Sequence, residues 1–171
     1  MNILTGNITN IQGSDSLSLV KIAVGSSTFT AIIIDTPESE EYFKIGNTVK
    51  VYFKETEVII AKNEPLNISI QNKILCNIES IKRGEILSEL HLRFGEFNIK
   101  SLITTNAVKT LNLKNGDAVL ALIKTNEVSL SPNDWFKSFM VNRWTGLDYD
   151  RYFAGGFCAA LLLACLHQIQ I

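Results

Sequence analysis

Apolar and polar residues alternate in short segments of the chain, and alternation with a period of two is typical of β-strands that bury one face. Residues 19–24 show it most clearly, because Val20, Ile22 and Val24 fall on one face of the predicted strand and Lys21 falls on the other. The pattern therefore predicts a protein built mainly from strands. Further predicted strands, rich in β-branched and aromatic residues, are residues 28–34, 48–54, 97–104 and 117–123.

The chain contains an internal repeat with a period of 70 residues. Residues 4–60 align without a gap on residues 74–130, and thirteen positions carry the same residue in both copies. Gly25 aligns with Gly95, and both glycines stand where the pattern predicts a hairpin turn. A unit of this length is close to the lower limit for an independent core, so we expect the units to pair or to form oligomers.

Each copy also contains the signals of one short helix. In the first copy Thr36 is the expected cap and Pro37 the first helical residue, and in the second copy Asn106 is the expected cap, with the end at Asn115-Gly116. Five strands and a short helix per copy predict an all-β protein with two tandem, small, partly open barrels of the OB type. The predicted divisions are residues 1–63 for the first domain, 64–72 for the linker and start of the second unit, 73–131 for the second domain, and 132–171 for an unassigned tail.

The tail is aromatic and apolar and differs in character from the repeat. Its run at residues 153–166 is about 14 residues long, which is short of the roughly 20 residues that a membrane-spanning helix needs. The run suits a helix that packs on the barrels or on another subunit, or one in a membrane interface, although it lacks the charged opposite face of such interfacial helices. We expect no membrane span. Cys158 and Cys165 are seven residues apart, a spacing that favours packing along one side of a helix over a metal site.

Charge and cysteine content narrow the class of protein. The formal net charge is −1, so no general basic field is available for nucleic acid. The three cysteines form no disulfide framework, and no leader-like segment opens the sequence, so we expect a cytoplasmic protein with reduced thiols.

The second copy resembles the Mop (molbindin, TOBE-like) family in three segments, residues 69–72, 101–104 and 123–128. The last segment is the most specific, because an apolar strand is followed by a lysine, a few small or polar residues and a valine. The first copy matches at residues 31–33 and 53–58, so the resemblance covers about residues 2–131. It implies small barrels that assemble into trimers or dimers and bind molybdate or tungstate between subunits, as stores, as sensor domains of regulators or as end domains of transporter ATPases. The sequence shows no helix-turn-helix region and no phosphate loop, which excludes the full-length regulator and transporter forms.

Molybdate is a dianion that only accepts hydrogen bonds, so a site for it requires donors and one or two cations. The resemblance implies that the lysine after the strand, the next residue's N–H group, a hydroxyl from the middle strand and a Ser-x-Arg segment supply them. The candidate oxyanion-binding residues are Lys124, Thr125, Thr104, Ser69, Gln71 and, in the first copy, Lys54.

Several positions depart from the family pattern. Gln71 stands in the place of the arginine and brings no charge, and Cys76 stands in the place of a glycine. In the first copy Ile34 replaces the hydroxyl and Glu55 follows Lys54. We therefore expect the second copy to hold the better preserved site. Loss of one charge-assisted hydrogen bond, worth about 1.5–3 kcal/mol, lowers its affinity by about tenfold or more.

Other interpretations stay open at the level of sequence. Lys54 and Lys124 also suit solvated strand ends, Thr104 suits an ordinary strand, and Ser69 suits a linker. Two further functions remain, an OB-type nucleic-acid-binding module and an assembly module whose oxyanion site has decayed. We expect no enzyme, because no acid–base pair or nucleophile arrangement accompanies His91.

Overall fold

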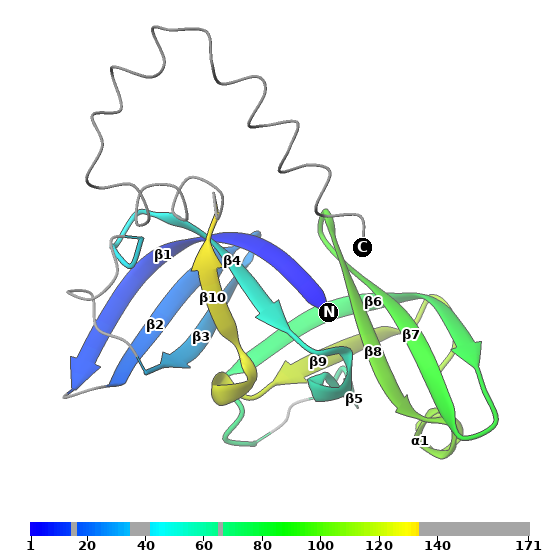
Figure 1. The fold of residues 1–171 in the computed structure, drawn as a ribbon. Coiled ribbons are helices and arrows are strands. Elements are labelled where there is room, and N and C mark those ends of the chain that lie inside the picture. The colour runs from blue at the N-terminus through cyan, green and yellow to red at the C-terminus, as the bar shows by residue number, and fades with distance from the viewer. Residues whose placement is uncertain (15–16, 35–41, 65–66, 134–171) are drawn as a thin grey trace, which may run out of the picture. The chain divides into compact units, whose positions relative to one another are not determined.

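The computed structural model describes residues 1–14, 17–34, 42–64 and 67–133 (Figure 1). The helix start predicted at Thr36 and Pro37, the connector at Pro65 and the apolar run at residues 153–166 lie outside the described residues.

The described strands recur after 70 residues, as the sequence repeat predicts. The first copy contains β1 (Asn2–Ser14), β2 (Leu17–Val24), β3 (Ser27–Ile33), β4 (Thr48–Phe53), the 3-10 helix η1 (Glu55–Glu57) and β5 (Ile59–Lys62). The second copy contains β6 (Asn72–Arg83), β7 (Leu87–Phe94), β8 (Phe97–Thr104), the helix α1 (Thr105–Thr110), β9 (Ala118–Ile123), the 3-10 helix η2 (Thr125–Glu127) and β10 (Ser129–Pro132).

The strands form two five-stranded antiparallel sheets that exchange their last strands. The first sheet has the order β10-β4-β1-β2-β3 and the second has the order β5-β9-β6-β7-β8. Thus β5, from the first copy, pairs with β9, and β10, from the second copy, pairs with β4. Figure 1 shows β10 in yellow beside the cyan β4, among strands of the first copy. The mostly-β class predicted from the pattern is confirmed, and neither sheet is built from one copy alone.

Burial follows the alternation seen in the sequence. Val20, Ile22 and Val24 are buried along β2, and Lys21 is exposed. The predicted hairpin turns are present, and Gly25 and Gly95 adopt φ values of 53° and 55°, a left-handed conformation that glycine reaches without a Cβ clash. Buried side chains from both sheets belong to one continuous core.

The first strand of each copy carries a bulge at the same place. The pairing of β1 with β2 shifts between Ile8 and Asn10, and the pairing of β6 with β7 shifts between Ile78 and Ser80. A bulge bends the strand and increases its twist. The two edge strands of each sheet approach each other, since β10 contacts β3 and β5 contacts β8.

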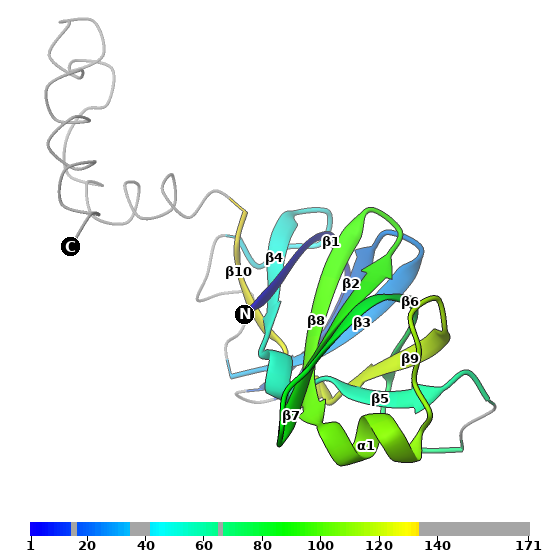
Figure 2. The same cartoon turned by 90° about the vertical axis from the view of Figure 1, so that its right-hand side faces the viewer.

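The helix of the second copy begins earlier than the sequence predicts. Its N-cap is Thr104, whose hydroxyl accepts a hydrogen bond from the Ala107 N–H at 3.1 Å, so the prediction of Asn106 as cap is wrong. The predicted end at Asn115-Gly116 is also wrong, because α1 ends at Thr110. Asn112, with a φ of 48°, takes the left-handed conformation soon after the helix. Figure 2 shows α1 as a short helix that follows β8. Threonine and asparagine both serve as caps, so residue type alone does not choose between them.

Candidate functional site

Two of the candidate residues lie at the same end of the second sheet. The ladder between β6 and β9 ends with the pair Asn72 and Ile123. Gln71 comes directly before that pair on one chain segment and Lys124 directly after it on the other. The register therefore places Gln71 and Lys124 at neighbouring positions, and both side chains carry hydrogen-bond donors.

Lys124 also opens the turn that contains Thr125. Its backbone is extended, and its carbonyl accepts a hydrogen bond from the Glu127 N–H at 3.1 Å, which closes η2. This turn lies against β3 of the first sheet. Lys124 and Gln71 are exposed and Thr125 is half-buried, so an anion in solution can approach all three. Hereafter the residues Gln71, Lys124 and Thr125 are called the second corner.

Thr104 lies far from the second corner in the same chain. It pairs with Leu87 at the end of β8, and on the other side of β7 the strand β6 ends with Arg83 opposite Ser88. The twelve residues of β6 separate this end from Gln71, and a strand rises roughly 3.3 Å per residue. Thr104 is exposed, and its hydroxyl already accepts the hydrogen bond of the helix cap.

Ser69 is exposed in the segment that leads into β6, two residues before Gln71. Within the described residues, no hydrogen bond or ion pair joins any two of the six candidates. One chain therefore gathers Gln71, Lys124 and Thr125, with Ser69 nearby in sequence, and leaves Thr104 at the other end of the sheet.

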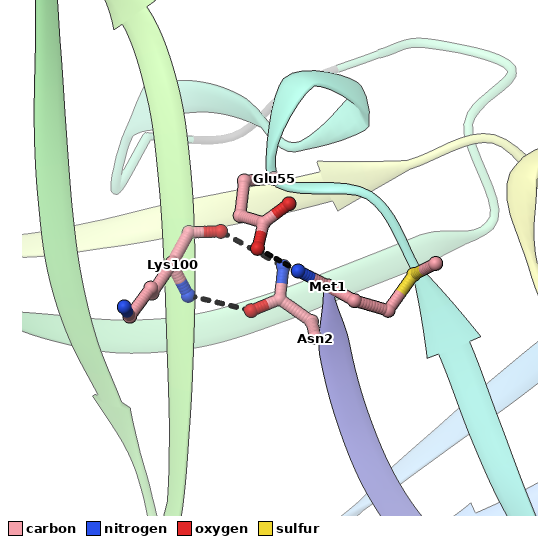
Figure 3. Close-up of polar contacts among 4 residues, drawn as sticks. All are labelled: Met1, Asn2, Glu55 and Lys100. Carbon is pink, nitrogen blue, oxygen red and sulfur yellow. Dashed lines mark hydrogen bonds and ion pairs between the residues drawn. The ribbon is translucent and has the colours of Figure 1, made fainter. Parts of the chain in front are cut away.

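The equivalent position in the first copy carries charged groups of both signs. Met1 takes the place of Gln71, and Glu55 takes the place of Thr125 beside Lys54. The α-amino group of Met1 forms an ion pair with the Glu55 carboxylate (Figure 3). This contact shows that the residues just beyond the last rung of the ladder lie together. We call Met1, Lys54 and Glu55 the first corner.

Two buried asparagines, which the sequence patterns did not single out, support the two corners. Asn72 donates to the Thr30 carbonyl at 2.9 Å and accepts from the Thr30 N–H at 2.6 Å. Asn2 makes the same two bonds to Lys100, at 2.9 Å and 2.7 Å (Figure 3). Asn2 and Asn72 are themselves separated by the repeat period of 70, and that identity was the signal available in the sequence.

Cys76 is a buried free thiol in β6. Burial raises the pKa of Cys76 from 9.0 to about 12, so the thiol is protonated at neutral pH. Its equivalent in the first copy is Gly6, where an added Cβ would lie 2.5 Å from the Ala23 carbonyl oxygen. The glycine of the family pattern is thus present in the first copy.

His91 forms a polar cluster on β7. Its Nε2 lies 2.6 Å from a Glu89 carboxylate oxygen, and the Lys82 ammonium lies 3.7 Å from the same oxygen. The hydrogen bond from His91 is the main cause that lowers the pKa of Glu89, and the charges of Lys100, His91 and Lys82 lower it further.

The described residues contain no group of three or more His, Cys, Asp or Glu side chains able to hold a metal ion. No helix in the described part of the chain is both long and apolar enough to span a bilayer.

Comparisons with known proteins agree with this fold. Residues 68–130 match the protein family described as TOBE domain. Among solved structures, the chain is similar to the cytoplasmic molybdate-binding protein ModG, crystallised with molybdate bound, at 23% identity and a TM-score of 0.72. That match covers 77% of this chain and 95% of ModG, so the two share their fold across both copies.

A shorter match is to a molybdate-binding protein from Sporomusa ovata, at 29% identity and a TM-score of 0.34, covering 34% of this chain and 88% of that one. A comparison with curated proteins gave no match.

Proposed function

We propose that the protein binds a tetrahedral oxyanion, molybdate or tungstate, for storage, buffering or sensing, and the match of residues 68–130 to the family described as TOBE domain supports this proposal. The observation that carries the proposal is the second corner, in which Gln71 and Lys124 end the same ladder and Thr125 follows. These groups donate hydrogen bonds, and no carboxylate occupies those three positions. That is the chemistry a dianion without protons requires.

Lys124 supplies the positive charge of the proposed site. Thr125 offers its backbone N–H and hydroxyl, Gln71 offers its amide, and Ser69 offers a hydroxyl from the segment before β6. Thr104 lies too far away within one chain, so its proposed role requires a neighbouring chain in a dimer or trimer. An oxyanion bound between chains then stabilises the oligomer, because it binds only the assembled form.

The first corner is a poorer oxyanion site. The Glu55 carboxylate stands in the place of the Thr125 donor and repels a dianion, and it already pairs with the Met1 ammonium, which is then less available to a ligand. Lys54 therefore contributes at most a long-range attraction, which salt screens. We expect one strong oxyanion site per chain, in the second copy.

The wider assignment follows from the same proposal. We propose that each sheet forms one OB-like barrel, and that the two domains, at residues 1–63 and 73–131, exchange their last strands, β5 and β10. The protein acts as a cytoplasmic binding protein and not as an enzyme.

Calorimetry with molybdate, tungstate, sulfate and phosphate tests the proposal. We expect micromolar or tighter binding of molybdate and tungstate, and an affinity loss of about tenfold or more in Lys124→Ala, because a charge-assisted hydrogen bond is worth roughly 1.5–3 kcal/mol. Lys54→Ala is the matched control, since it removes the same side chain from the first corner, and we expect less than about a threefold change. Absence of binding to all four anions, with salt-sensitive binding to oligonucleotides, would instead support a nucleic-acid-binding module.

A further inference from the structure

Asn72 joins the second corner to the other sheet. Its side chain is fully buried and uses both its donor and its acceptor on the backbone of Thr30, which lies in the edge strand β3. Asn72 thus makes the two backbone hydrogen bonds that a neighbouring strand would make if β3 were not at the edge of its sheet. The Thr30 N–H and C=O are buried, and buried backbone groups require partners.

We call the pair of hydrogen bonds from one asparagine side chain to the backbone of an edge-strand residue a clasp. The clasp of Asn72 lies next to the proposed ligand site along the chain. Gln71 is its neighbour in sequence, and Ile123, its partner in the ladder, is followed by Lys124. The turn after Lys124 also lies against β3. Both segments that carry donors therefore contact the same strand of the first sheet, β3.

From this arrangement we propose that Asn72 is a positioning residue for the oxyanion site, which holds Gln71 and the Lys124 turn in register while making no contact with the ligand itself. The inference rests on the proposed function of the second corner. Pre-organised donors bind more tightly because less ordering remains to be done when the ligand arrives. Asn72 thus raises oxyanion affinity through the geometry of its neighbours.

Asn2 provides an internal control for this proposal. It forms the same two bonds, to the backbone of Lys100, and is buried to a similar extent. It borders the first corner, where Glu55 disfavours an oxyanion. If the clasps only stabilise the fold, loss of either asparagine should change oxyanion affinity equally. If Asn72 positions the site, only the loss of Asn72 should weaken oxyanion binding.

The experiment compares Asn72→Ala with Asn2→Ala in the full chain. We expect similar decreases in Tm for the two variants, and a tungstate affinity at least fivefold weaker in Asn72→Ala than in Asn2→Ala, measured where circular dichroism shows both to be folded. Equal affinities in the two variants would overturn the positioning role. If Asn72→Ala does not fold, Asn72→Ser and Asn2→Ser replace the pair, because the smaller polar side chain retains a hydroxyl beside the edge strand.

Hydrogen exchange separates this inference from the proposed function, because it requires no ligand. The Glu127 N–H closes the Lys124 turn and the Glu57 N–H closes the equivalent Lys54 turn, each at 3.1 Å. We expect the Glu127 amide to exchange at least fivefold faster in Asn72→Ala and at its normal rate in Asn2→Ala. Unchanged exchange in both variants would refute the inference, whereas a wild-type protein that binds none of the four anions would refute the proposed function.

Discussion

Gly6 offers a sharp test of how closely the strands of the first sheet pack. A Cβ added at this position would lie 2.5 Å from the Ala23 carbonyl oxygen, 2.6 Å from Val24 Cγ2 and 2.8 Å from Ile22 Cγ2. All three contacts are shorter than real Cβ atoms show, and one of them is with backbone. Gly6→Ala therefore forces β1 and β2 apart, and the sheet cannot relieve the clash by rotating a side chain.

The expected cost lies at the upper end of the range for overpacking, about 3 kcal/mol. A change of 1 kcal/mol shifts Tm by roughly 2–4 °C in a chain of about this size, so we expect Tm to fall by about 6–12 °C. Gly13→Ala is the matched control in the same strand, because its added Cβ would meet only Ser18 Oγ at 3.9 Å. It should be neutral or stabilise by up to about 1 kcal/mol, since a glycine is removed from a strand.

Urea unfolding followed by circular dichroism measures both free energies of unfolding. Equal stabilities for Gly6→Ala and Gly13→Ala would refute the packing argument. Cys76, at the position equivalent to Gly6, is accommodated with its side chain buried. The two sheets therefore differ in how they pack at this position, and the replacement of the family glycine in the second copy is compatible with an intact β6.

Two further predictions concern the thiol and the strand exchange. The native pKa of Cys76, about 12, exceeds its unfolded value of about 9, so its contribution to the free energy of unfolding is complete below pH 9. That contribution is lost as the pH rises towards 12, by about 1.4 kcal/mol per pH unit. Urea unfolding at pH 8 to 11 should show a smaller loss of stability at alkaline pH for Cys76→Ala than for the wild type, and equal losses would contradict the assignment. A fragment of residues 67–133 lacks β5, so the edge of β9 is unpaired and can bind the β10 strand of a second fragment. We expect analytical ultracentrifugation to show a strand-exchanged homodimer. A stable monomer at high concentration would contradict this expectation.

The alternation of residues predicted the strands well, because burial on one face is a local property of each segment. The hairpin at Gly25 and its copy at Gly95 followed from local turn chemistry in the same way. The exchange of β5 and β10 had no such signal. These strands are copies of each other, so each satisfies the pattern beside either β4 or β9, and only the three-dimensional path of the connections decides between them.

The candidate site was predictable only in part, for a related reason. The repeat and the lysine motif located Lys124, but the register that places Gln71 beside it depends on pairing between segments about 50 residues apart. Sequence gives no distance between Thr104 and Lys124, so their separation across β6 emerged only from the structure. The clasps at Asn2 and Asn72 were not predicted because asparagine is common in turns, so an asparagine near the start of a strand gives no sign in the sequence that it is buried.

The exchange of last strands also determines the order in which the two sheets can be completed during translation. On the ribosome, β4 and β5 are made well before β9 and β10, the strands with which they pair. The first sheet cannot acquire its fifth strand until Pro132 has left the exit tunnel, and until then the nascent chain exposes an unpaired edge that favours aggregation. A premature stop codon before residue 118 would consequently leave both halves of the molecule unfinished, including the half whose own codons had all been translated.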